Sequence, residues 1–397
     1  MFHSLKQPRL YSLIAFWGML TATLIGQPLR PLSPSAQISL MTCAPGEDLY
    51  SAFGHSAVRV YDSERGIDSI YNYGTFDFDP PGFYVDFVKG KLNYRLNRES
   101  YRMFDRIYRY FERSYQAQEL NLTYDQKVAT YQFLENNAKP ENAYYLYDFF
   151  YDNCATRIRD LMVEILGDSL RYHQPHQVGD STLRDILDQY IEMRAWSDFG
   201  IDLALGAVID DATTPWIQMF HPDYLAWEFA KAEVYRNGSW QPLVQQTYPI
   251  YTDDPAFSPT PWYLHPWFLF GLILLTVAAF TWLRRSQQPT RLVGDGILFS
   301  LAGLGGLVLF LLTFATDHTA TAANWNLFWL IPTHLVAAIW LFRSKRPAWL
   351  RWYFGASAGI IVLLLLCWTI LPQALSTQGL PLMLLLLLRS AIIWRKG

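Results

Sequence analysis

Long apolar stretches fill the chain after Pro261, whereas the preceding region mixes apolar and polar positions as a globular domain does. A helix that crosses the hydrocarbon core of a membrane needs about 20 apolar residues. The pattern predicts five spans, at about 264–283, 297–316, 325–342, 352–371 and 380–394. The fifth span is the shortest and contains Arg389. We therefore expect residues 262–397 to form an all-α bundle of five transmembrane helices.

Positive charge is distributed unevenly among the loops of this bundle. Lys and Arg follow the first and third spans and end the chain, at Arg284, Arg285, Arg291, Arg343, Lys345, Arg346, Arg351, Arg395 and Lys396. The loops 317–324 and 372–379 contain neither residue. Because cationic loops face the cytoplasm, we expect residues 27–261 to lie outside it and the C-terminus inside.

The N-terminus carries Lys6 and Arg9, then an apolar run over residues 10–25, then Gly26. Cations followed by a short apolar core and a small residue are typical of a secretory signal. An uncleaved membrane anchor is the alternative. Residues 1–26 are therefore expected to be a signal peptide or an N-terminal anchor, and either one exports the domain that follows.

Residues 38 to about 170 show the pattern of a mixed α and β domain. Residues 56–61 and 69–74 alternate and are rich in β-branched or aromatic side chains, which predicts neighbouring strands with a turn at Gly66. Thr123 followed by Gln126 is a capping box. Helices are expected at about 123–138, 182–194 and 222–235.

Composition excludes some functions. The net charge of −3 and the lack of a basic stripe argue against a nucleic-acid partner. The three cysteines are too few for a disulfide framework in a chain of 397 residues.

Two short strings carry the candidate chemistry. FGHS, which contains His55, lies at the start of a predicted strand, and YDNCATR, which contains Cys154, lies at the start of a predicted helix. Asp152 or Asn153 can cap that helix, and its N–H groups should lower the pKa of Cys154 below about 8.5. His55 could then take the thiol proton. A helix-borne Cys that faces a strand-borne His, with the His first in the chain, predicts a permuted papain-like thiol-enzyme domain of the α+β class.

Other interpretations of these residues stay open. A single Cys is often a small buried hydrophobic residue, and a single His is often a polar residue satisfied by its neighbours. A disulfide between Cys43 and Cys154 is a further alternative, which an oxidising compartment permits. Cys367 lies within a predicted span and is expected to serve packing.

Four strings occur in the order TCAPGEDLYSAFGHSAVRV, YNYGTFDF, FVKGKLNYRL and YDNCATRIRD. Together they resemble the bacterial Lnb-type lipoprotein N-acyltransferases, which join an extracytoplasmic thiol-enzyme domain to five membrane helices. The resemblance continues through Asp317-His318, the string NWNLFWL and His334, and so covers about residues 38–342. The Cys-containing string is also similar, more distantly, to lecithin:retinol-type acyltransferases.

The resemblance implies an activity. Cys154 would be the nucleophile and His55 its general base, in the periplasmic domain of a protein of the bacterial inner membrane. The acyl donor would be a membrane phospholipid, and the acceptor would be the free α-amino group of a diacylated lipoprotein. Because an ester becomes an amide through an activated thioester, no cofactor is expected. The backbone N–H of Cys154 is the expected donor to the oxyanion.

Further site residues are expected around this pair. Asn72 and Tyr73, on the neighbouring strand, are candidates to orient His55, although Asn72 could instead bond the backbone and Tyr73 could belong to the core. Substrate contacts are expected from polar residues near the helix and at the outer face of the bundle: Asn153, Arg157, Asp317, His318, Asn324, Asn326 and His334. Interhelical hydrogen bonds are the alternative for the bundle residues. Arg157 and Arg159 could contact a phosphate, and a surface salt bridge is the alternative for at least one of them.

Two other functions compete with acyl transfer. A membrane-anchored cysteine peptidase or amidase of the cell envelope would use the same Cys154 and His55, but one anchor would suffice for it. A membrane-tethered binding module would need no nucleophile, so Cys154→Ser would leave its function intact.

Overall fold

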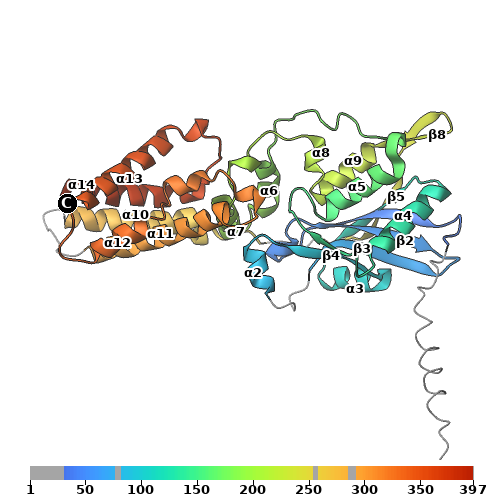
Figure 1. The fold of residues 1–397 in the computed structure, drawn as a ribbon, viewed down its shortest axis with the longest axis horizontal. Coiled ribbons are helices and arrows are strands. Elements are labelled where there is room, and N and C mark those ends of the chain that lie inside the picture. Colours follow the sequence, from blue (N-terminus) through green and yellow to red (C-terminus); the bar gives the residue numbers. More distant parts are fainter. Residues whose placement is uncertain (1–30, 77–81, 254–257, 285–291, 397) are drawn as a thin grey trace, which may run out of the picture.

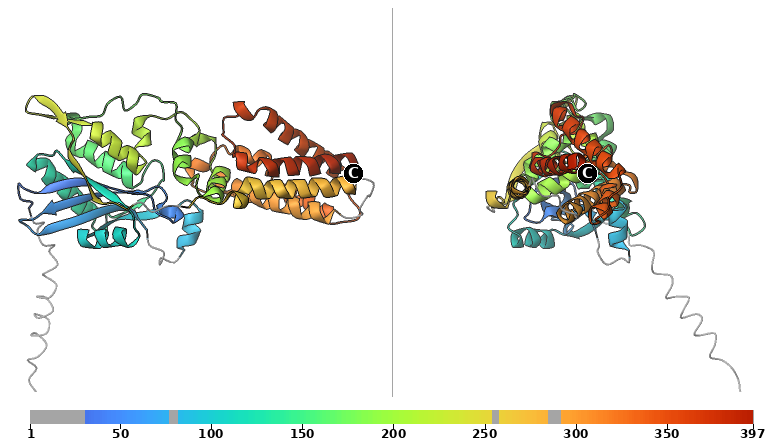
Figure 2. Two further views of the ribbon diagram at one scale, coloured as in Figure 1. Left: turned by 180° about the vertical axis from the view of Figure 1, so that it is seen from behind. Right: turned by 90° about the vertical axis from the view of Figure 1, so that its left-hand side faces the viewer.

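The computed structural model describes residues 31–76, 82–253, 258–284 and 292–396. The predicted signal or anchor, residues 1–26, lies outside the described residues. An α+β domain and a helical bundle lie end to end (Figure 1), and the same arrangement is seen from behind in Figure 2. The expected fold class, an α+β domain followed by a helical membrane domain, is confirmed.

The α+β domain is built on a seven-stranded antiparallel sheet with the order β10-β5-β1-β2-β3-β4-β6. Its strands are β1 Gln37–Cys43, β2 His55–Asp62, β3 Ile67–Thr75, β4 Asn93–Ser100, β5 Tyr115–Leu120, β6 Tyr144–Leu146 and β10 Val244–Tyr251. A smaller sheet contains β7 Leu170–Arg171, β8 Glu233–Arg236 and β9 Ser239–Pro242. The predicted strands 56–61 and 69–74 are confirmed as β2 and β3, which pair with each other.

Helices cover both faces of the large sheet (Figure 1). Side chains of a strand alternate between the faces. Val58 and Tyr71 therefore enter the core beneath α5 (Cys154–Leu166), whereas Ala57 and Ile70 pack on the side of α3 (Tyr101–Tyr110). The helices α4 (Tyr124–Asn137) and α9 (Pro222–Lys231) lie on the α5 side.

The predicted helices of this domain are present, with corrected ends. The capping box of Thr123 and Gln126 begins α4, as predicted. The helix predicted at 222–235 ends at Lys231, because Val234 and Tyr235 belong to β8 and pair with β9. The one predicted at 182–194 is α6 (Leu183–Ile191), which ends three residues early, and α7 begins only at Ala195. The remaining helices are α2 Phe83–Val88, α7 Ala195–Ala204 and α8 Pro215–Gln218.

The bundle contains α10 Pro266–Leu283, α11 Val293–Phe314, α12 His334–Leu341, α13 Trp349–Leu366 and α14 Leu380–Lys396. In the described part, four helical stretches are long and apolar enough to cross a membrane, and α12 is not among them. The continuous third span predicted at 325–342 is therefore wrong. A 3-10 turn at Trp325–Phe328 precedes α12, and Pro332 separates the two, since proline cannot donate the helical hydrogen bond.

The interrupted third segment still follows the whole length of α11. Leu292, just before α11, donates its N–H to the carbonyl of Leu341 at 3.0 Å, at one end of the pair. A Cβ on Gly306 would lie 2.0 Å from the Leu330 carbonyl oxygen, so this glycine permits a close backbone approach. Small residues bring membrane helices together in this way. The chain thus traverses the bundle five times, once by a broken segment.

Arg389, a charge within the fifth predicted span, is neutralised by a partner on another helix. Its guanidinium donates to both carboxylate oxygens of Asp295 on α11, at 2.5 and 2.7 Å, and to Thr281 on α10 at 2.6 Å. Intramembrane charges are tolerated when they pair. This contact ties α10, α11 and α14 together.

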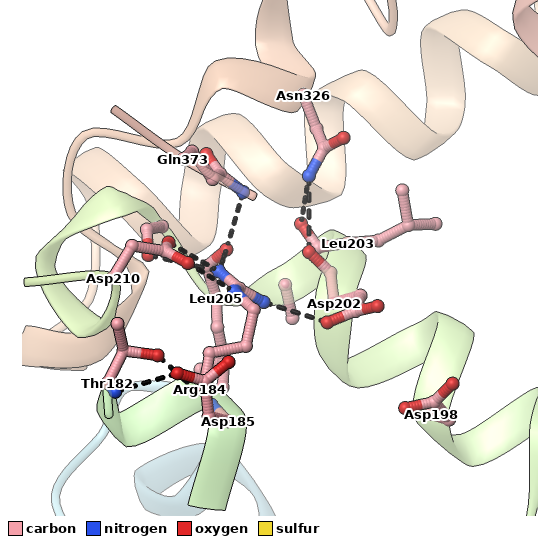
Figure 3. Close-up of polar contacts among 12 residues, drawn as sticks. Thr182, Arg184, Asp185, Asp198, Asp202, Leu203, Leu205, Asp210, Asn326 and Gln373 are labelled. Atoms are coloured by element: carbon pink, nitrogen blue, oxygen red, sulfur yellow. Dashed lines mark hydrogen bonds and ion pairs between the residues drawn. The ribbon is translucent and has the colours of Figure 1, made fainter. Parts of the chain in front are cut away.

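The two domains meet at the C-terminal end of α7 (Figure 3). Asn324 and Asn326, from the bundle, donate to the last carbonyls of α7, and Gln373 donates to Leu205 at 2.9 Å. Within the α+β domain, the buried Arg184 forms salt bridges with Asp202 and Asp210. Side chains of the membrane domain therefore satisfy carbonyls that a helix end leaves free.

Replacing Gly206 by alanine should weaken this junction. Its Cβ would stand 1.8 Å from the Ala322 carbonyl oxygen, so the two backbones must move apart and break the bond from the Gly206 N–H to Ala320. We expect the melting temperature of the detergent-solubilised chain to fall by roughly 5 °C or more. Gly200→Ala is the matched control, because its Cβ would meet nothing within 4 Å. Equal melting temperatures for both variants would contradict the prediction.

Candidate active site

Cys154 is the first residue of α5, and Asn153 caps that helix. The Asn153 side-chain oxygen accepts from the N–H groups of Ala155 and Thr156, at 2.8 and 2.9 Å. Its amide nitrogen donates to the carbonyls of Phe149 and Phe220, at 2.7 and 2.8 Å. All polar atoms of the Asn153 side chain are thus engaged. Asn153 therefore fixes the position of Cys154, and its predicted substrate contact stays a prediction.

The Cys154 thiol is free and almost fully buried. Burial raises its pKa to about 11, while the N–H groups of Ser56, Ala155 and Cys154 itself lower it by a smaller amount. The expected fall of the pKa below its ordinary value is therefore wrong in sign. The helix N-terminus acts as predicted, but the loss of water outweighs it.

The alternative disulfide between Cys43 and Cys154 is also wrong, since both cysteines are free. Cys43 lies on β1 directly across from His55. Burial raises its pKa to about 12. Both cysteines of the α+β domain are therefore protonated at neutral pH.

His55 begins β2 and takes part in a chain of polar side chains. Its Nε2 lies 3.1 Å from Oδ1 of Asn72 on β3, and Nδ2 of Asn72 donates to Glu99 on β4. Because a carboxylate only accepts, the Asn72 amide must present its oxygen to His55. His55 therefore donates from Nε2, which leaves Nδ1 free to act as a base. Asn72 thus contacts His55 as predicted.

The sulfur of Cys154 and the ring of His55 approach the start of β2 from different sides. The N–H of Ser56, the residue after His55, points at the sulfur. The ring shares the side of the sheet that holds Asn72 and Cys43, and in the described part of the chain no hydrogen bond joins it to the sulfur. Catalytic hydrogen bonds are often long before substrate binds. Proton transfer between these two groups stays a prediction.

Burial lowers the pKa of His55 to about 4, with a smaller opposing effect of the Asn72 hydrogen bond. The imidazole is therefore neutral above about pH 5 and the thiol is neutral below about pH 10. At rest the thiol is therefore protonated and the imidazole is uncharged. This state differs from the thiolate and imidazolium expected from the position of Cys154 at a helix N-terminus.

The pH dependence of alkylation tests this resting state. Because a raised pKa favours the thiol, the rate at which iodoacetamide modifies Cys154 should rise about tenfold per pH unit from pH 7 to 10. At pH 7 it should be roughly a hundredfold below that of an ordinary thiol. Peptide mass spectrometry of the full-length protein resolves Cys154 from the other two cysteines. A rate that is constant from pH 5 to 8 would reveal a preformed thiolate and contradict this assignment.

Two other predicted residues near the thiol serve packing and charge pairing. Tyr73 is buried in the core and packs edge-on against Tyr145, which is the alternative left open for it. Arg157 forms a bidentate ion pair with Asp152, and its guanidinium carbon lies 3.7 Å from the centre of the Tyr145 ring. A phosphate would have to compete with Asp152 for this guanidinium.

Arg159, named in the same alternative, pairs with Asp160 and donates to the Trp216 carbonyl. Both arginines of this helix therefore form salt bridges, although the Arg159 side chain is buried rather than on the surface.

Most of the predicted polar residues of the bundle bond protein groups. Asn324 and Asn326 hold the end of α7, and His334 is fully buried with Nδ1 2.7 Å from the Tyr353 hydroxyl on α13. These contacts agree with the alternative stated for these residues, in which they form hydrogen bonds between helices. Asp317 is exposed and His318 is half-buried, and their described hydrogen bonds come from the backbone.

The loop from Asp317 to Asn324 brings the membrane domain to the nucleophile. The N–H of Asp317 donates to the Lys89 carbonyl, beyond α2, at 2.8 Å. The hydroxyl of Thr319 donates to Asp148 at 2.9 Å. The backbone of Asp148 pairs with that of Asp152, two residues before Cys154. Substrates held at this end of the bundle would therefore lie near the thiol-bearing turn.

Sequence reasoning missed several residues of this region. Glu99, Tyr145 and Thr319 come from elements whose alignment with the site depends on tertiary packing. Gly74 was also missed. It has a φ of 82°, and a Cβ at this position would contact Cys154. The glycine in the string YNYG is the sequence feature from which it could have been predicted.

Comparison with protein-family models agrees with this two-domain structure. Residues 33–189 match the Lnb N-terminal periplasmic domain, and residues 258–396 match the Lnb transmembrane domain. The curated proteins and the solved structures compared with the chain gave no match. The two matched ranges include Cys154, His55 and all five bundle helices. The chain therefore belongs to the Lnb family of membrane proteins, with a periplasmic N-terminal domain and a transmembrane domain.

Proposed function

We propose that this protein is a lipoprotein N-acyltransferase of the bacterial inner membrane, with its C-terminus in the cytoplasm. It moves a fatty acyl group from a phospholipid to the α-amino group of a diacylated lipoprotein through a thioester on Cys154. Family membership supports the activity. The orientation rests on the cationic loops, which the positive-inside rule assigns to the cytoplasm.

One observation carries the lipid assignment. The turn that leads into Cys154 is bonded to the loop between α11 and the third membrane segment, through Asp148 and Thr319. A peptidase that acts on the cell wall needs an anchor but no contact between its nucleophile turn and a membrane bundle. A phospholipid ester, in contrast, lies at the membrane surface, which is where the proposed orientation puts this contact.

The reaction would proceed in two steps. His55 takes the proton from Cys154 as the sulfur attacks the ester carbonyl, and the departing lysophospholipid receives that proton. The lipoprotein amine then attacks the thioester, His55 accepts a proton from the amine, and the proton returns to the sulfur as the amide forms. Asn72 keeps the tautomer of His55 that leaves Nδ1 free. Burial of the thiol limits hydrolysis of the thioester by water.

Trapping the acyl-enzyme tests this proposal. The purified full-length protein, incubated with phospholipid vesicles alone, should gain the mass of one acyl chain at Cys154, and neutral hydroxylamine should remove it. Addition of a diacylated lipopeptide should discharge the chain into an N-acylated product. Discharge to free fatty acid alone would favour an envelope hydrolase, and absence of any adduct would contradict both enzymes.

A further inference from the structure

The hydroxyl of Tyr145 is buried, and no group of the described structure accepts its proton, although the backbone N–H of Gly74 faces its oxygen. Tyr145 lies on the short strand β6, and its phenol interacts electrostatically with the Cys154 thiol. A buried hydroxyl whose proton has no acceptor destabilises the folded protein. A group of this kind next to a nucleophile needs an explanation, and a bound acceptor would supply one.

Gly74 keeps a space open between Tyr145 and Cys154. A Cβ at residue 74 would lie 3.8 Å from Cβ of Cys154, 3.9 Å from the Tyr145 oxygen and 3.3 Å from the Tyr147 ring. These three groups therefore surround one small volume, which any side chain at residue 74 would fill. The carbonyl of a thioester on Cys154 would have to occupy a volume that adjoins the Cys154 Cβ in this way.

Burial raises the pKa of the Tyr145 hydroxyl, and the positive charge of Arg157 opposes this rise. Its guanidinium carbon lies 3.7 Å from the centre of the Tyr145 ring, and the pair with Asp152 holds it there. A cation over the face of a phenol draws electron density from the ring. The hydroxyl proton, which no described group accepts, is thereby made more available to an anion.

We propose that Tyr145 is a catalytic residue that donates a hydrogen bond to the oxyanion formed at Cys154; the proposal rests on the acyl transfer proposed above. When the sulfur bonds to the carbonyl carbon, the π electron pair moves onto the oxygen. Tyr145 and the backbone N–H of Cys154 then donate to that oxygen. As the carbonyl re-forms, the bond to the alcohol oxygen breaks, and the leaving alkoxide receives the proton held by His55.

The variant Tyr145→Phe tests this role in the purified full-length protein. It removes one oxygen and keeps the ring that packs against Tyr73 and Arg157. We expect acylation of Cys154 by p-nitrophenyl butyrate and by phospholipid vesicles to slow by about a hundredfold, as for other oxyanion donors. Alkylation by iodoacetamide, which forms no oxyanion, should stay within about twofold of the wild-type rate.

Tyr172→Phe is the matched control. The Tyr172 hydroxyl is also buried without a partner, but its ring packs on Trp216 and Phe229, and Cys154 is not among the groups that influence its pKa. This variant should acylate at the wild-type rate. If Tyr145→Phe behaves in the same way, or if its acylation and alkylation fall together, the oxyanion role is overturned.

The two esters separate this inference from the proposed function. Wild-type protein that reacts with p-nitrophenyl butyrate but not with phospholipid would contradict the proposed donor, while dependence on Tyr145 would still support the oxyanion role. Reaction with neither ester would overturn both.

Discussion

Replacing Cys154 by alanine is expected to lower the rate of lipopeptide N-acylation by about four orders of magnitude or more, to background. The free thiol of Cys154 lies at the start of α5 among the N–H groups of Ser56 and Ala155, and the alanine variant removes this nucleophile. The assay uses purified protein, phospholipid vesicles and a diacylated lipopeptide, with the N-acylated product quantified by mass spectrometry. Cys367→Ala, in the membrane domain, is the control and should keep full activity. Substantial residual activity of Cys154→Ala would exclude a thioester intermediate.

Replacing His55 by alanine should have the second largest effect, a loss of about 10²–10⁴ in turnover at pH 7. Because the pKa of Cys154 is raised to about 11, the thiol cannot ionise by itself at this pH and needs a base. The loss should shrink as the pH rises toward 10, where solvent hydroxide takes over deprotonation.

His173→Ala provides the control for this variant. His173 is an exposed histidine that contacts Glu233, in the smaller sheet region. It should leave the rate unchanged at every pH. If His55→Ala loses the same factor at pH 7 and pH 10, His55 acts through structure rather than as the base.

Local signals in the sequence predicted the framework of the site. The alternation of β2 and β3 and the polar residues before Cys154 predicted the strands and the capped helix correctly. The contact of Asn72 with His55 could be predicted because Asn72 lies on the strand that pairs with the strand of His55. Each of these predictions depends on neighbours within a few residues or on a single strand pair.

Packing between distant segments determined the rest. The pKa of Cys154 rises because several elements exclude water from the thiol, and no string of residues shows that burial in advance. Glu99 reaches Asn72 only through the register of β3 and β4. The end of α7 receives Asn324 from a segment about 120 positions later in the chain. The broken third span could have been predicted from Pro332, which lies inside its apolar run.

Several polar residues of the bundle form hydrogen bonds to the periplasmic domain at the junction. Asn324, Asn326 and Gln373 hold α7, and Thr319 holds the turn before Cys154. The sequence analysis singled out Asn324 and Asn326 at this end of the bundle, but neither Gln373 nor Thr319. Their bonds to the periplasmic domain, in contrast, follow from the close approach at Gly206.

Mass spectrometry of lipoprotein N-termini, in cells that depend on this protein for lipoprotein maturation, tests the central claim most directly. With the wild-type chain we predict N-acylated, triacylated lipoproteins. With Cys154→Ala at equal membrane abundance we predict diacylated lipoproteins with a free α-amino group. Triacylated N-termini that persist in the Cys154→Ala cells would contradict acyl transfer through this thiol.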